Sequence, residues 1–152
     1  MKRPALAALI AACWVLCSGS SVLPDPKPQG DGMPTYQEFE NKIERYPYAA
    51  SPERVRRIVA GISKVTHCMT KAQIRALLGK PDYSRLNYGP KGPGEKWLGS
   101  DWTFYISKRD SGTNLNDPRV EIFFDTHDRA HWIAPTRMEA AHEIGGPSSK
   151  CD

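Results

Sequence analysis

Residues 69–81 read Met-Thr-Lys-Ala-Gln-Ile-Arg-Ala-Leu-Leu-Gly-Lys-Pro, and this stretch predicts a short helix with both ends marked. Thr70 can cap the start, because its hydroxyl accepts a hydrogen bond from a free backbone N–H of the first turn. Gln73 lies three residues later and completes a capping box. Gly79 can adopt the left-handed conformation that ends a helix, and Pro81 prevents the helix from continuing.

The predicted helix has one apolar face. Ile74, Leu77 and Leu78 recur at the i, i+3 and i+4 spacing that places them on the same side. Met69 precedes the cap and can contact Ile74 as a hydrophobic staple. So short a helix is not stable alone in water. It must therefore dock on an apolar surface formed elsewhere in the chain.

Two further helices are expected before this one. Thr35-Tyr36-Gln37-Glu38 is a second capping box, and apolar residues then recur with helical spacing as far as Tyr46. Ser51-Pro52-Glu53 combines a capping residue, a first-turn proline and an acidic residue, which is typical of a helix start. Residues 64–68 form a short link to the helix at 70–79. The last two helices should therefore form a helical hairpin.

Strands are expected in the second half of the chain. Residues 97–106 and 119–125 alternate apolar and polar side chains, and residues 129–134 return from a turn as the second arm of a hairpin. A weaker strand is expected at 83–88. Helices followed by strands indicate an α+β fold. We expect a two-layer sandwich in which the helical hairpin packs on one face of a three- to four-stranded antiparallel sheet.

A partner could bind the sheet face that the helices leave open. In the strand at 97–106, Trp102, Phe104 and Ile106 alternate with Thr103 and Tyr105. If the first set faces the helices, Thr103 and Tyr105 lie on the other face, which must be wet or covered. We therefore expect these two residues to form an exposed interaction surface.

The first 21 residues have the pattern of a secretory signal. Lys2 and Arg3 precede an apolar run that is too short to span a bilayer, and small polar residues follow. Cys17 and Cys13 are the two candidates for lipidation: Cys17 gives the better signal length, and small residues precede Cys13. Simple secretion, with cleavage after Ser20 or Ser21, is the alternative. Residues 22–34 are rich in proline and glycine and predict an extended tether.

Charge and cysteine content exclude other classes. The formal net charge is +4, but removal of residues 1–17 leaves 19 Lys and Arg against 17 Asp and Glu. The basic residues are scattered, so no nucleic-acid partner is expected. Cys68 and Cys151 remain after signal removal and can pair in an oxidising compartment or stay as free thiols.

We find no pattern that indicates an enzyme. No serine or cysteine lies in a nucleophile elbow, and the glycines at 89–94 lack the context of a phosphate loop. Asp125, His127 and His131 could hold a zinc or nickel ion, but Asp and His are ordinary turn residues and strand alternation separates their side chains. We therefore expect no metal, no cofactor and no catalysis.

A family resemblance rests on the residues of the central helix and two strands. Met-Thr-x-x-x-Ile-x-x-Leu-Leu-Gly-x-Pro, followed by Trp-Thr-Phe-Tyr and Val-Glu-Ile-Phe-Phe-Asp, resembles the SmpA/OmlA family of small envelope lipoproteins of Gram-negative bacteria. It covers residues 64–134 and includes seven motif positions: Met69, Thr70, Ile74, Leu77, Leu78, Gly79 and Pro81. It implies a lipid anchor at the outer membrane and a role in outer-membrane β-barrel assembly.

These observations divide the chain into four parts. We expect a signal segment at 1–21, a tether at 22–34, an SmpA/OmlA-like α+β domain with an extra N-terminal helix at 35–135, and a flexible tail at 136–152. The function expected is a non-catalytic lipoprotein whose periplasmic domain binds and stabilises a protein assembly. The alternative is a secreted or lipidated inhibitor or immunity protein that binds an enzyme through its sheet face.

Overall fold

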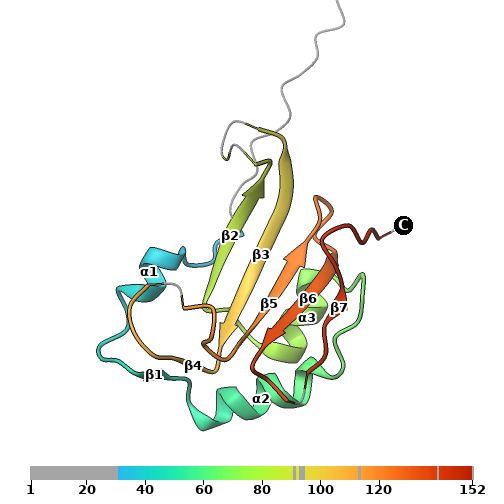
Figure 1. Cartoon of the computed structure of the whole chain (residues 1–152). Coiled ribbons are helices and arrows are strands. Elements are labelled where there is room, and N and C mark those ends of the chain that lie inside the picture. Colours follow the sequence, from blue (N-terminus) through green and yellow to red (C-terminus); the bar gives the residue numbers. More distant parts are fainter. Residues whose placement is uncertain (1–30, 91, 93–94, 113, 140, 152) are drawn as a thin grey trace, which may run out of the picture.

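The structure is a computed structural model that describes residues 31–90, 92, 95–112, 114–139 and 141–151. The expected signal segment 1–21, with Cys13 and Cys17, and residues 22–30 of the expected tether lie outside the described part. The described elements are, in order, α1 (Tyr36–Glu40), β1 (Tyr48–Ala49), α2 (Pro52–Ile62), α3 (Lys71–Leu78), β2 (Tyr83–Tyr88), β3 (Trp97–Tyr105), β4 (Ser107–Lys108), β5 (Arg119–Phe124), β6 (Ala130–Thr136) and β7 (Ile144–Gly145) (Figure 1).

The main sheet is antiparallel, with the strand order β2-β3-β5-β6-β7. In its centre Phe104 pairs with Val120, and Ile122 pairs with Ile133. β1 and β4 form a separate two-stranded sheet, in which Tyr48 lies opposite Lys108. The long hairpin of β2 and β3 extends past the ends of β5 and β6 (Figure 1).

The predicted sheet of three to four strands is wrong. The described residues form a five-stranded sheet and a two-stranded sheet, and about 31% of these residues are in strands against 21% in helices. The strands β1, β4 and β7 account for the difference. Each has only two residues, too few to show an alternating pattern. Each forms by pairing with a segment that is distant or irregular in sequence, which local reasoning does not detect.

Helix α3 forms as its sequence predicts. Thr70 caps the helix and makes the reciprocal capping box with Gln73, and Gly79 ends it with a φ of 86°. The preceding α2 begins at Pro52 with Ser51 as its cap. The two helices approach closely at Gly61, where an added Cβ would lie 2.9 Å from the Leu77 carbonyl oxygen. Glycine therefore permits the contact that closes the helical hairpin.

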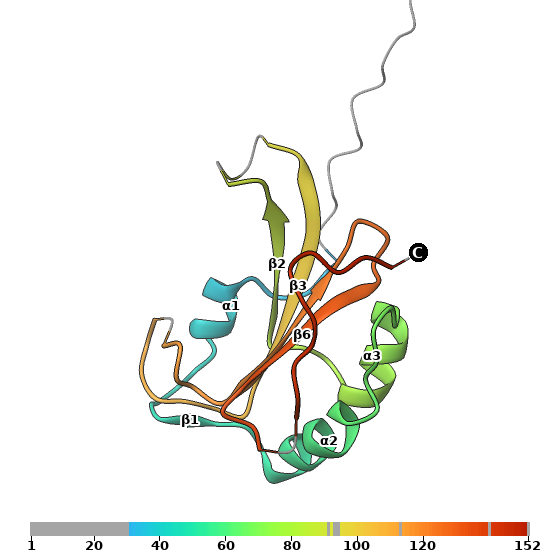
Figure 2. The same ribbon diagram turned by 45° about the vertical axis from the view of Figure 1, so that its right-hand side comes forward.

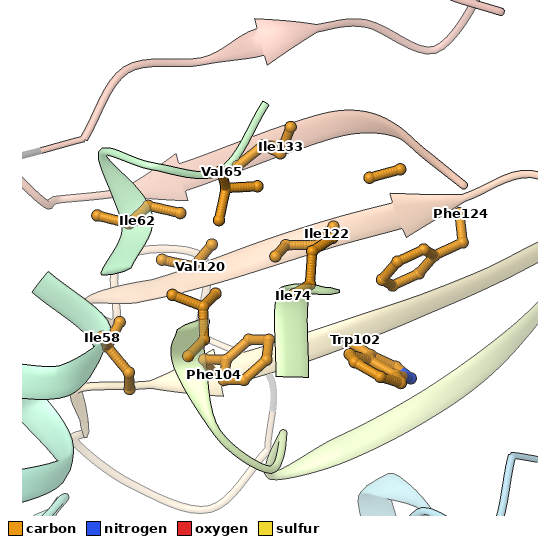
Figure 3. Close-up of a cluster of buried hydrophobic side chains, with 12 residues drawn as sticks. Ile58, Ile62, Val65, Ile74, Trp102, Phe104, Val120, Ile122, Phe124 and Ile133 are labelled. Carbon is orange, nitrogen blue, oxygen red and sulfur yellow. The ribbon is translucent and has the colours of Figure 1, made fainter. Parts of the chain in front are cut away.

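The main core lies between this hairpin and one face of the sheet. Figure 3 shows side chains from α2, α3, β3, β5 and β6 meeting in a single cluster. Ile74 and Leu78 of α3 are fully buried, and Met69 and Leu77 pack against the cluster from its edge. The short α3 is thus stabilised by docking rather than by its own propensity. The buried members are Ile58, Ile62, Val65, Ile74, Leu78, Trp102, Phe104, Val120, Ile122, Phe124, Ala130 and Ile133.

The prediction that the helices leave the second sheet face open is also wrong. Figure 2 shows α1 on the opposite side of the sheet from α2 and α3. Phe39 of α1 stacks on Tyr105 with ring centroids 5.5 Å apart and an interplanar angle of 7°. Tyr83 completes this second cluster. Phe39, together with the neighbouring strands, buries Thr103 and Tyr105 completely, so the expected exposed surface at these residues does not exist.

The C-terminal residues 136–152, expected to be a flexible tail, add structure to the edge of the sheet. Ile144 and Gly145 form β7 against Ile133 and Trp132 of β6. Cys151 forms a disulfide with Cys68, which precedes α3. The structure therefore adopts the paired state of the two cysteines that the sequence left open.

The end of the tether is held against the core. The Trp102 indole N–H donates to the Asp31 carboxylate, and the Lys71 ammonium lies 3.3 Å from the same oxygen. Burial raises the pKa of Asp31, but these donors lower it more, and the net direction is downward. No helix among the described residues has the length and apolar character needed to cross a membrane.

We expect Leu78→Ala to destabilise the domain by roughly 2–5 kcal/mol, because it removes a fully buried side chain and leaves a cavity. Urea unfolding followed by tryptophan fluorescence measures the change. Leu98→Ala is the matched control: Leu98 is 50% exposed, so its truncation should stay within about 0.5 kcal/mol. Equal effects of the two substitutions would contradict the docking of α3.

Candidate binding groove

A groove of about 590 Å³ lies on the sheet. It lies where β5 ends and β6 begins, between the β2–β3 hairpin and the C-terminal segment. Phe123 and Trp132 form its floor. They alternate with the core residues Ile122 and Ile133, so they leave the sheet on the face opposite α2 and α3.

The floor of the groove is aromatic and rigid. Phe123 and Trp132 pair across the two strands and stack with ring centroids 4.4 Å apart and an interplanar angle of 18°. The Trp132 indole N–H donates to the Glu143 carboxylate at 2.7 Å. Both rings are only partly buried. The groove thus presents two stacked aromatic rings. Their one polar atom, the Trp132 indole nitrogen, already has a hydrogen-bond partner.

Two segments form the walls. Tyr88 and Leu98 come from the tip of the β2–β3 hairpin, and Pro147, Ser149 and Cys151 come from the C-terminal segment. Leu98 is half exposed. Beside it, Gly99 has a φ of 128°, and a side chain there would collide with the backbone of Phe124. The close approach of β3 to β5 at this glycine sets where the first wall stands.

The rim holds the histidines that the sequence singled out. Asp125 accepts hydrogen bonds from the backbone N–H groups of His127 and Arg129, at 2.8 and 3.0 Å. It therefore orders the turn. His131 places Nδ1 3.3 Å from the carbonyl oxygen of Gly146. The structure does not bring Asp125, His127 and His131 together as ligands. Within the described residues, the His, Cys, Asp and Glu side chains that converge are those of His67, Cys68 and Cys151.

A charged network lies next to the groove on the same sheet face. Asp101 is fully buried, 3.2 Å from Nε of Arg85, which also lies 3.6 Å from Glu121. Burial raises the pKa of Asp101, and Arg85 offsets only part of this shift. Glu121 pairs in turn with Arg119 at 3.0 Å. Arg85 and Arg119 thus pair with the acids of this network, while Asp101 Oδ1 is buried with no hydrogen-bond partner among the described residues.

The second charged site surrounds Lys108, far from the groove. Lys108 is fully buried, and its ammonium lies 2.8 Å from Glu40 and 5.4 Å from the centre of the Tyr46 ring. Burial lowers the pKa of Lys108, but Glu40 and Tyr36 together raise it more, and the net direction is upward. Burial and the neighbouring Glu40 raise the pKa of Tyr46 to about 12. The ammonium also donates to the carbonyl oxygens of Asp110 and Gly112.

Lys108 thus acts as a structural clamp that joins α1 to β4. Tyr36 and Tyr105 complete the cage of rings around its ammonium. The Lys108 ammonium thus lies within 6.0 Å of the centres of three tyrosine rings. The sequence offered no signal for it, since a lysine in a polar loop reads as a solvated residue.

Sequence reasoning missed the groove, although a signal was present. Strand alternation places Phe123 opposite the inward-facing Ile122 and Phe124, and a large apolar residue on a supposedly wet face is informative. The second wall could not be predicted, because it depends on where the tail docks. Comparisons with family models, with curated proteins and with solved structures found no match to this chain.

We expect Lys108→Met to destabilise the domain by about 3–5 kcal/mol, because it leaves the Glu40 carboxylate buried without its partner. Adding Glu40→Gln should restore part of the loss, since no buried charge then remains. Chemical denaturation of both variants measures this. A double variant as unstable as Lys108→Met, or a single variant as stable as the parent, would contradict the clamp.

Proposed function

We propose that this chain is an exported, non-catalytic binding protein of the cell envelope, whose groove takes up a segment of a partner protein. The observation that carries the proposal is the open aromatic floor formed by Phe123 and Trp132. Aromatic residues are enriched at the centres of protein interfaces. Rigid, stacked rings provide contact area at a low cost in side-chain entropy.

The chemistry of the groove favours a protein segment over a small substrate. Its described lining residues are mainly aromatic, aliphatic and polar, with Lys150 and Asp125 as the charged members. Asp125 and the nearby Glu143 already accept hydrogen bonds within the fold. The buried charges Asp101 and Arg119 are paired. A partner that inserts an apolar side chain between Leu98 and Trp132 would displace water from both without breaking a hydrogen bond.

Export is supported by independent features. The N-terminal 21 residues have the signal pattern, and a disulfide such as Cys68–Cys151 is typical of an oxidising compartment. The resemblance to the SmpA/OmlA family makes outer-membrane assembly proteins the first partners to test. We place the domain at the periplasmic face of the outer membrane, anchored through a lipid on Cys17 or Cys13.

The groove can be tested by site-specific photo-crosslinking in intact envelopes. A photoreactive amino acid replaces Leu98, which lines the groove, or Leu115, which is 75% exposed and lies outside it. We expect a discrete protein adduct from position 98 that position 115 does not give. Trp132→Ala should reduce the position-98 adduct while the domain stays folded, as judged by its thermal unfolding.

The identity of the adduct then separates the functions. Outer-membrane assembly proteins would support a scaffolding role, whereas an enzyme or toxin would support the inhibitor alternative. Identical adducts from both positions, or an adduct at position 98 that survives Trp132→Ala unchanged, would overturn binding through the groove. The absence of an adduct at both positions would also overturn binding through the groove.

The anchor is tested by labelling cells with a palmitate analogue. We expect the wild-type chain to incorporate the label and either Cys17→Ser or Cys13→Ser to lose it, because the acyl chain is attached to one cysteine of the signal region. Cys68→Ser is the matched control and should keep the label. Absence of label from the wild type would make the chain a soluble exported protein.

A further inference from the structure

One cluster of metal-binding side chains remains without a role, at the end of the groove. Ligand atoms of His67, Cys68 and Cys151 all lie within 4.8 Å of one another, and His67 Nδ1 is 2.9 Å from Cys68 Sγ. All three residues are partly buried. In the structure the two sulfurs are joined as a disulfide. The positions of these atoms therefore suit two alternative states: a covalent bond between the two sulfurs, or one metal ion bound by both sulfurs and His67.

The backbone holds these residues in place without the disulfide. The Cys68 N–H donates to the Ala130 carbonyl at 2.7 Å, and the Ala130 N–H donates to the Met69 carbonyl at 2.8 Å. These bonds fix Cys68 with a φ of 67°, in the left-handed region that few non-glycine residues adopt. On the other side, the pairing of β7 with β6 holds the segment that leads to Cys151. Reduction would therefore leave both thiols close together.

The imidazole of His67 is available as a ligand. Its Nε2 is buried and has no hydrogen-bond partner among the described residues, which is unusual for a buried polar atom. The ring packs against Gly145, where an added Cβ would lie 3.3 Å from His67 Cδ2. Packing thus orients the ring with Nδ1 beside Cys68 Sγ, and a neutral imidazole can bind an ion at one nitrogen and carry a proton at the other.

We propose that His67, Cys68 and Cys151 bind a zinc ion when the Cys68–Cys151 disulfide is reduced. Two thiolates and one imidazole are a known donor set for Zn²⁺, and three protein ligands leave the fourth position open. Cys151 lines the groove, so the site lies at the groove wall. The site goes beyond the proposed function and does not depend on it.

A dithiol is the reductant that opens the Cys68–Cys151 disulfide. The dithiol gives two electrons and two protons to the S–S bond, which becomes two thiols, and is itself oxidised to a disulfide. Zinc binding then releases two protons, because thiolates are the ligands. In the oxidised chain each sulfur is bonded to the other and offers no thiolate. The oxidised and the zinc-bound states therefore exclude each other.

The proposal is tested by zinc competition against a coloured chelator. All proteins are the full chain with Cys13→Ser and Cys17→Ser, so that only Cys68 and Cys151 can contribute thiols. We expect the reduced chain to take up one zinc ion and the oxidised chain none. His67→Ala should weaken binding by at least about tenfold, the smallest loss typical even of residues that only support a ligand. His142→Ala is the matched control and should bind as the parent does.

Thermal unfolding supplies the second measurement. Zinc should raise the unfolding midpoint of the reduced chain, because an ion that binds only the folded state stabilises it. It should not raise the midpoint of the Cys68→Ser or Cys151→Ser variant. The proposal is overturned if the reduced chain binds zinc no better than Cys68→Ser, if His67→Ala binds as well as the parent, or if zinc fails to stabilise the reduced chain.

Discussion

Strand β3 is buried on both faces, and the rest of the structure depends on this constraint. Every residue from Gly99 to Tyr105 is buried. On one face Trp102 and Phe104 contact the helical hairpin, and on the other Tyr105 lies beneath α1. A strand buried on both faces needs cover for each. The chain supplies that cover from its N-terminal half, where α1 lies on one side and α2 and α3 on the other.

Double burial also explains the unusual number of buried charges. An antiparallel strand that alternates apolar and polar residues places its polar set in the second layer, and burying a charge is costly unless it is paired. Asp101 is therefore matched by Arg85, and Lys108, just after β3, by Glu40. Such pairs contribute less to stability than to specificity, because α1 can dock only where Glu40 reaches the ammonium.

Local sequence signals predict local structure here, and fail where distant segments meet. The capping box of Thr70 and Gln73 and the alternation of residues 119–124 identify α3 and β5, since each signal lies within its own element. Tyr105 was assigned to an exposed face because nothing in β3 itself reveals that Phe39 will stack on it. The same limit applies to β7 and to the groove wall at Pro147, whose positions depend on how the tail docks.

The C-terminal segment connects the groove with the Cys68–Cys151 pair. Its end forms one wall of the groove, and Cys151 within that wall is bonded to Cys68, immediately before the central helix. The wall is thus held by β7 at one end and by Cys151 at the other. The floor of Phe123 and Trp132 belongs to the main sheet and stays fixed. Partner binding at the floor of the groove and disulfide or zinc chemistry at its wall therefore involve different residues, although both lie on one surface.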